Sequence, residues 1–237
     1  ACRCGGPFAW KGKDMGRIIG ALVLGVMGAA ILLSLGIWQV QRLAWKEGVL
    51  AEIEARIAAA PVAIPEVPDP EVDRYLPVAV TGRFAPGHVR VLVSQRGLGA
   101  GYRIISPFET ESGRLILVDR GVIRVADDLP DAPSGEITVT GNLHWPEERD
   151  GFTPENDIAG NIWFAREVPM LADYFGTEPV LVIARALSTP EAVTPLPVST
   201  EGIPNDHLNY AITWFSLAAV WLGMTLFLLW RIRRRIA

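Results

Sequence analysis

The chain has few cysteines and few histidines, two and three among 237 residues. Both cysteines, Cys2 and Cys4, lie in the leader, so disulfides are not expected to hold the long middle segment together. As a C-x-C pair with no third ligand nearby, they make a poor metal site. We expect the leader, residues 1–15, to be disordered.

Recognisable catalytic motifs are also missing. There is no phosphate-binding loop, no nucleophile elbow and no H-E-x-x-H zinc motif. Gly97, Gly99 and Gly101 stand between two predicted strands, which is typical of a hairpin and not of a dinucleotide site. One group of residues could suggest a metal site, but we interpret it as a solvated acidic loop: His144, Glu147, Glu148 and Asp150. We therefore predict that the protein is not an enzyme.

Charge is absent from two long apolar runs, residues 18–35 and 210–230. With a rise of ~1.5 Å per residue, a helix of either length crosses the ~30 Å hydrocarbon core of a bilayer. We predict transmembrane helices at 16–40 and 207–231. A cleaved signal peptide is the alternative for the first run, but the run is long for one and no small-x-small cleavage site follows it.

The flanking charges predict the orientation. Basic residues precede the first run, and four arginines follow the second, three of them in the tail 232–237. Residues 41–206, by contrast, carry 14 basic and 25 acidic residues. Basic flanks stay in the cytoplasm, so both termini should be cytoplasmic and the middle segment periplasmic. That segment has no basic patch with interleaved aromatic residues, which argues against a nucleic acid partner.

The middle segment, residues 41–206, predicts an extracytoplasmic β-rich domain. Helical periodicity continues to about residue 60, and a proline-rich linker follows. Strand-like segments separated by glycine and proline occur at 75–84, 88–94, 102–108, 114–120, 136–143 and 179–184, and a short helix is predicted at 168–175. The fold class is therefore an α+β membrane protein, with two transmembrane helices flanking an antiparallel β-rich sandwich or barrel.

Small residues on both apolar runs suggest that the two helices pack together. On the first run they form two rows, Ala21-Gly25-Ala29 and Gly16-Gly20. On the second run Ser216, Ala219 and Gly223 lie on one stripe. Small residues let helix backbones approach closely in lipid.

His207 stands just before the second apolar run and is the only histidine near either run. In a helix, His207, Tyr210 and Trp214 are spaced i, i+3 and i+7 and share a face. An imidazole beside aromatic side chains could bind a haem iron at the membrane interface. The alternative is an ordinary interfacial residue, because tyrosine and tryptophan are common in that layer whatever the function.

Three segments resemble the Surfeit-locus cytochrome c oxidase assembly factors, the Surf-one family. Residues 35–46 read LGIWQVQRLAWK, 101–108 read GYRIISPF with LVDRG at 117–121, and 205–215 read NDHLNYAITWF. The family pattern has Asn where this chain has Asp119, and Trp-Val where it has Val122-Ile123. We expect these two departures to affect a detail of the domain surface.

The resemblance implies an assembly factor that binds haem a and aids its insertion into the catalytic subunit of cytochrome c oxidase, working with other assembly factors. It implies that His207 contacts the haem iron. The predicted cofactor-binding residues are His207, Tyr210, Trp214, Arg42 and Trp38, with Arg42 available to a haem propionate. For Trp38 and Arg42, an interfacial anchor is the alternative.

A second hypothesis gives the protein no haem. In it, the chain is an accessory membrane subunit that scaffolds the oxidase. For both hypotheses we favour the bacterial plasma membrane over the mitochondrial inner membrane as the location.

Overall fold

The computed structural model describes residues 12–95, 97–129 and 131–236, which form three helices and seven strands. These residues divide into two compact units. One belongs to Ala1–Leu50 together with Ile203–Ala237, and we call it the helix pair. The other, Ala51–Gly202, is here called the β-domain.

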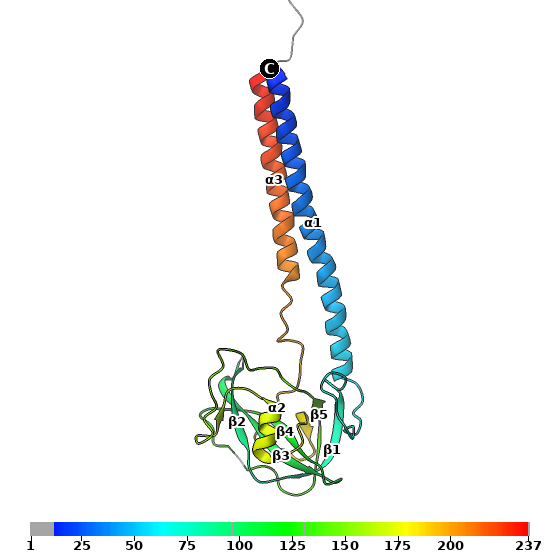
Figure 1. Cartoon of the computed structure of the whole chain (residues 1–237), viewed down its shortest axis with the longest axis vertical. Coiled ribbons are helices and arrows are strands. Elements are labelled where there is room, and N and C mark those ends of the chain that lie inside the picture. Colours follow the sequence, from blue (N-terminus) through cyan, green and yellow to red (C-terminus); the bar gives the residue numbers. More distant parts are fainter. Residues whose placement is uncertain (1–11, 96, 130, 237) are drawn as a thin grey trace, which may run out of the picture. The chain divides into compact units, whose positions relative to one another are not determined.

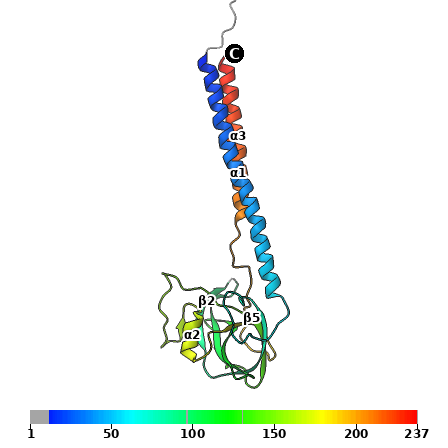
Figure 2. The same cartoon turned by 45° about the vertical axis from the view of Figure 1, so that its right-hand side comes forward.

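The helix pair consists of most of α1 (Gly12–Ile57) and all of α3 (His207–Ile236), which run side by side (Figure 1, Figure 2). Both are long and apolar enough to cross a membrane, and most of their side chains are exposed. α1 begins at Gly12, so the prediction of a disordered leader is wrong for residues 12–15. Once the apolar run has nucleated a helix, each further residue adds one backbone hydrogen bond, so the helix extends through neighbouring polar residues. Cys2 and Cys4 lie outside the described residues.

The contact between the helices follows a heptad spacing. The less exposed residues of α1 include 25, 29, 32, 36, 39 and 43, and those of α3 include 207, 211, 214, 218, 221 and 225. Alternating steps of four and three produce a continuous seam, as in left-handed coiled coils. The Trp221 indole Nε1 donates a hydrogen bond to the Gly25 carbonyl oxygen at 3.0 Å.

The seam uses only one of the small-residue rows predicted from sequence. Gly25 and Ala29 are buried in it, as expected. A Cβ at Gly16, Gly20 or Gly223 would meet nothing within 4 Å, and Ser216 and Ala219 are exposed, so those rows do not pack. The reason is Trp221: a Cβ at Gly28 would lie 2.4 Å from its Nε1 atom, so the large indole occupies the space over the α1 glycines.

The β-domain holds one mixed seven-stranded sheet. Its strands are β1 (Pro77–Phe84), β2 (Val89–Gln95), β3 (Gly99–Thr110), β4 (Leu115–Arg124), β5 (Ile137–Leu143), β6 (Ile162–Trp163) and β7 (Leu181–Leu187). The order is β1-β5-β7-β4-β3-β2-β6, and β1 also pairs with β3, so five strands close into a ring. The prediction of a purely antiparallel sheet is wrong, because β4 pairs with β7 and β2 with β6 in parallel. The connection from β4 to β7 is long enough to bring the chain back in the same direction.

The local elements of the β-domain mostly match their predicted ranges. The helix α2 occupies Val168–Phe175, as predicted, and Gly176 ends it in the left-handed conformation. Gly97 and Gly99 have positive φ in the β2–β3 hairpin, which supports the hairpin interpretation of the glycine motif. The sequence did not indicate β6, whose two residues are too few to show a period.

Strand β4 forms the middle of the core because both of its faces are buried. On one face Ile116 and Val118 pack with Val78, Phe108 and other residues of the ring. On the other face Leu117 packs with residues of β2, β7 and α2. Alternate residues of a strand point to opposite faces, so one apolar run serves both clusters.

Candidate functional site

His207 is the first residue of α3 and pairs with a residue of α1 that lies 168 positions earlier. Its Nδ1 atom is 2.7 Å from Oε1 of Gln39. Gln39 is 8% exposed, which makes it a buried polar residue of the seam. The motif that ends the first apolar run and the motif that begins the second are therefore joined by one hydrogen bond.

The hydrogen bond determines which imidazole nitrogen carries the proton. An amide oxygen only accepts, so with Oε1 facing the ring, Nδ1–H must be the donor. In the neutral ring the proton then resides on Nδ1, and Nε2 keeps its lone pair. Histidines that bind metals are commonly oriented this way, by donating their other N–H to a carbonyl or carboxylate.

The other predicted site residues separate into two groups. Trp214 lies on the seam one heptad after His207. Tyr210 is 56% exposed and lies off the seam, so the predicted single face of His207, Tyr210 and Trp214 is only partly present. Trp38 is 54% exposed, and the Arg42 guanidinium lies 3.8 Å from the Trp45 ring centroid, in a cation–π contact on the outside of α1.

Our choice of site residues from the sequence omitted Gln39, although the segment 35–46 contained it. The heptad spacing of α1 could have identified Gln39. Counting in alternating steps of four and three from Gly25 reaches Gln39, so an amide occupies a seam position that is otherwise apolar or small. A polar residue at such a position is a common determinant of helix register.

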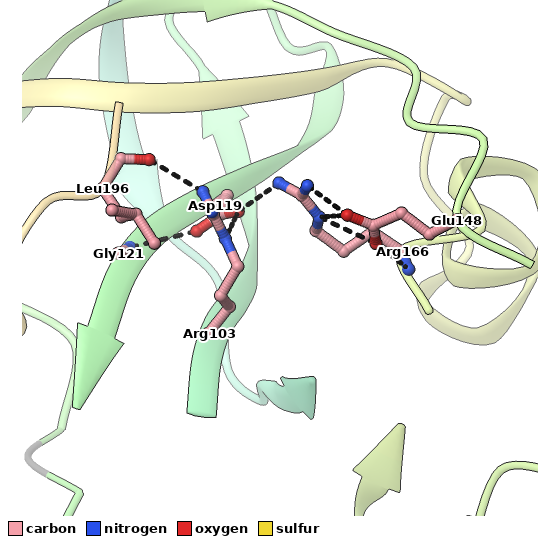
Figure 3. Close-up of polar contacts among 6 residues, drawn as sticks. All are labelled: Arg103, Asp119, Gly121, Glu148, Arg166 and Leu196. Carbon is pink, nitrogen blue, oxygen red and sulfur yellow. Dashed lines mark hydrogen bonds and ion pairs between the residues drawn. The ribbon is translucent and has the colours of Figure 1, made fainter. Parts of the chain in front are cut away.

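The β-domain contains a second polar constellation, in which a fully buried carboxylate joins two arginines (Figure 3). The Asp119 Oδ2 atom accepts from Arg103 Nε at 2.6 Å and from Arg166 Nη1 at 3.3 Å. Arg103 Nη2 also donates to the Leu196 carbonyl oxygen at 2.8 Å. Arg166 continues the network to Glu148, with Nε–Oε1 at 3.0 Å.

A bulge in β4 positions the buried carboxylate. Ile104 pairs with Gly121 and Ile105 with Asp119, which leaves Arg120 as the extra residue. Gly121 has a φ of 127°, and a Cβ there would lie 2.1 Å from the Thr194 carbonyl oxygen, so glycine is required. The backbone N–H of Gly121 donates to Asp119 Oδ1 at 3.1 Å. Our expectation that Asp119 alters a surface detail is therefore wrong, because its side chain lies in the core.

Arg166 and Glu148 each favour the ionised state of the other. Burial alone would raise the pKa of the Glu148 carboxyl, but hydrogen bonds and charge from Arg166 leave that pKa below its usual value. Burial alone would lower the pKa of Arg166, and its two carboxylate partners raise it instead. Each buried charge is therefore matched, which a stable buried ion pair requires.

The acidic loop is solvated at Glu147, Glu148 and Asp150, as expected, and only His144 is half-buried. Glu148 belongs to the Asp119 network, Glu147 pairs with Arg74 at 3.0 Å, and the His144 ring stacks on Tyr75 with centroids 5.2 Å apart. Burial first, and then the charges of Arg166 and Arg74, lower the pKa of His144 to about 4. Among the described residues, no group of three or more His, Cys, Asp or Glu side chains could hold a metal ion.

Comparison with known proteins identifies the family. The sequence model of the SURF1 family matches residues 26–219. The chain belongs to the SURF1 family. A SURF1-like protein of Monosiga brevicollis is 33% identical over 218 residues, covering 84% of this chain and 83% of the relative. Surfeit locus protein 1 of Xenopus tropicalis is 34% identical over 214 residues, covering 78% and 68%. A bacterial relative, the SURF1-like protein of Rickettsia conorii, is 31% identical over 199 residues, covering 79% and 82%.

The family match spans both polar constellations of this SURF1-family chain. Gln39, Asp119 and His207 all fall within residues 26–219. The resemblance stated from three short motifs is thus confirmed over most of the sequence, and relatives exist in bacteria and in eukaryotes.

Proposed function

We propose that this protein is a membrane-anchored assembly factor for haem-copper cytochrome c oxidase. In this proposal it binds haem a through His207 and aids insertion of the haem into the catalytic subunit, together with other assembly factors. The family membership supports the oxidase role, and the His207–Gln39 hydrogen bond is the observation that supports the haem role.

The residues at the start of α3 suit a haem iron. Gln39 fixes the ring of His207 and leaves Nε2 as the ligand atom. His207 would be the one imidazole holding the iron, and attachment through a single protein ligand would suit a carrier that must release its cargo. When bound, haem a would offer its iron and its carboxylates as points of attachment. The proposed role of this chain is to bind and hand over the haem, not to carry out a redox step.

Nearby side chains could hold the edges of the macrocycle. The exposed aromatic residues Tyr210 and Trp38 offer apolar faces, and Trp214 lies on the seam one heptad after His207. Arg42, now over the Trp45 ring, could pair with a propionate by rotation of its side chain. Haem binding should then lengthen the contact between Arg42 and Trp45.

We also propose that both termini are cytoplasmic and that the β-domain lies in the periplasm of a bacterial cell. The arginines that follow the second apolar run and the acidic middle segment support this orientation. A phosphatase reporter that requires the periplasm, fused to the C-terminus, should be inactive. The same reporter inserted in a β-domain turn should be active, and the reverse pattern would contradict the orientation.

Purification of the full chain in mild detergent tests the haem role. Haem should co-purify in proportion to protein, and His207→Ala should lose it while the protein stays folded. His88→Ala is the matched control, because His88 lies in the β-domain just before β2. Equal haem content in all three proteins would refute His207 as the ligand.

The second candidate function is a scaffold subunit without haem, and the same hydrogen bond gives it support. A buried His–Gln pair in a helix seam can serve only to fix the register of the helices. In that case His207→Ala would weaken helix pairing and leave the haem spectrum of the preparation unchanged. Association with the oxidase would also persist in the absence of haem synthesis.

A further inference from the structure

The β-domain contains a cavity of about 390 Å³, and none of the proposed haem-binding residues lines it. The cavity is lined by Arg103, His144, Arg166 and Ile183 and by residues of the segment 196–202. Its volume lies within the range of small-molecule sites, about 300–1,000 Å³. All of these residues belong to the β-domain, so the cavity is complete within one unit.

The cavity lining includes two cationic side chains but not the carboxylates that pair with them. The guanidinium-bearing residues Arg103 and Arg166 line it, but Asp119 and Glu148, which neutralise them, do not. Asp119 is fully buried behind the two arginines (Figure 3). Among the described lining residues, the one carboxylate is Glu201, on the segment 196–202.

Hydrogen-bonding capacity remains unused around this cavity. Arg103 uses Nε for Asp119 and Nη2 for the Leu196 carbonyl oxygen. The Nδ1 atom of His144 is buried and has no hydrogen-bond partner among the described residues. Buried polar groups are rarely left unpaired in native proteins, and a ligand is one way of satisfying them.

The electrostatic environment at His144 favours an anion. The groups that act on this imidazole are Arg166, Arg74 and Arg103, opposed by Glu148. The three positive charges dominate, and with burial they lower the pKa of His144 to about 4. An anion beside the ring would reduce this repulsion.

Part of the cavity lining is apolar. Ile183 of β7 and the residues Leu196, Pro197 and Val198 supply hydrocarbon surface. We propose that the cavity binds a small organic carboxylate with a short hydrocarbon tail, its carboxylate against Arg103 and His144 and its tail against Ile183 and the segment 196–202. A planar carboxylate matches the fork of donors that a guanidinium presents.

Calorimetric titration of the full chain in phosphatidylcholine nanodiscs with hexanoate tests this site. Hexanamide, of the same length but uncharged, is the control ligand. Hexanoate should bind with 1:1 stoichiometry and about tenfold or more tighter than hexanamide, because hydrogen bonds to a charged group are stronger than neutral ones. Equal affinities for the two ligands, or no saturable binding of hexanoate, would overturn the proposal.

Two variants locate the binding. His144→Leu removes a donor from the cavity, and His88→Leu is the same change outside it. Only the first should weaken hexanoate binding, by about tenfold. Ser199→Trp, at an exposed lining position, should block the cavity without disturbing the core. If His144→Leu fails to fold, Ser199→Trp alone tests whether hexanoate binds in this cavity. Undiminished binding in Ser199→Trp would overturn the assignment of the site.

Discussion

The helix pair and the β-domain bury polar groups in opposite ways. In the seam between α1 and α3, Gln39 and His207 form one part-buried hydrogen bond that involves no carboxylate or guanidinium. In the β-domain, Asp119 is buried between two guanidiniums, and Arg120 pairs with Glu191 at 2.5 Å. A charge is costly to bury unless every partner is present, whereas a neutral hydrogen bond is cheaper to form or to lose.

This difference separates the roles of the two regions. The β-domain network should behave as a unit, because removing one member leaves other buried charges unpaired. The His207–Gln39 pair can open at a smaller cost, since each group can find another partner. A hydrogen bond of that kind leaves His207 able to bind a ligand, which is the role proposed for it.

Removing the centre of the network should have the largest effect. Asp119→Ala leaves Arg103 and Arg166 without their shared carboxylate and should destabilise the β-domain by about 3–5 kcal/mol. Urea-dependent hydrogen exchange of peptides from β4 measures this. Asp127→Ala, which removes an exposed ion pair with Arg124, should leave the same peptides nearly unchanged. Equal effects from the two variants would show that the network is not a cooperative unit.

Filling the seam should have the next largest effect. In Gly28→Leu, the new side chain must displace Trp221, because even a Cβ would lie 2.4 Å from its Nε1 atom. We expect the helix pair to lose about 1–3 kcal/mol, measured by SDS titration with far-UV circular dichroism. Gly223→Leu is the matched control, since nothing lies within 4 Å of its Cβ position. If Gly223→Leu is the more damaging variant, the seam lies on the other stripe of α3.

Acid should weaken the β-domain, and His144 should account for much of the effect. The folded-state pKa of His144 is lowered to about 4, below the ~6.5 of an unfolded chain, so the unfolded state takes up a proton that the folded state refuses. Stability should therefore fall as pH falls from ~6.5 to about 4, by on the order of 1–2 kcal/mol after allowance for solvent screening. Glu148, whose pKa is also lowered, acts in the same direction when it protonates at still lower pH.

Replacing the imidazole tests that assignment. His144→Gln should flatten the pH dependence of β-domain unfolding between pH 6.5 and 4, since no group then titrates differently at that position. His88→Gln should flatten it less, because burial lowers the pKa of His88 to a smaller extent. A pH profile that is the same in wild type and His144→Gln would contradict the role given to His144.

Local structure was predictable from the sequence, whereas the partners of buried groups were not. The periodicity of residues 168–175 predicted α2 with its observed ends, and glycine spacing predicted the β2–β3 hairpin. Strand patterns do not show which strands pair, so the parallel β4–β7 contact was missed. The partners of Asp119 lie 16 and 47 residues away, a separation that no local pattern records.

The helix seam shows a similar limit. Small residues on the second apolar run suggested a stripe through Gly223, but the structure places Trp221 and Ala218 at the contact. Packing depends on complementary volumes on both helices: Gly28 makes room for the large side chain of Trp221, and Gly25 for Thr225. Gln39 was missed for the related reason that its role depends on a residue of the other helix.

The most direct test of the proposed haem role is a titration with haem a of the wild type, His207→Ala, Gln39→Leu and His88→Ala in detergent. His207→Ala should lose the axial-imidazole spectrum and most of the affinity. Gln39→Leu should retain the ligand but weaken binding about 10–100-fold, because the ring loses the partner that orients it. His88→Ala should match the wild type. Equal affinity and an identical spectrum in all four proteins would contradict the account and leave the His207–Gln39 pair as a structural contact.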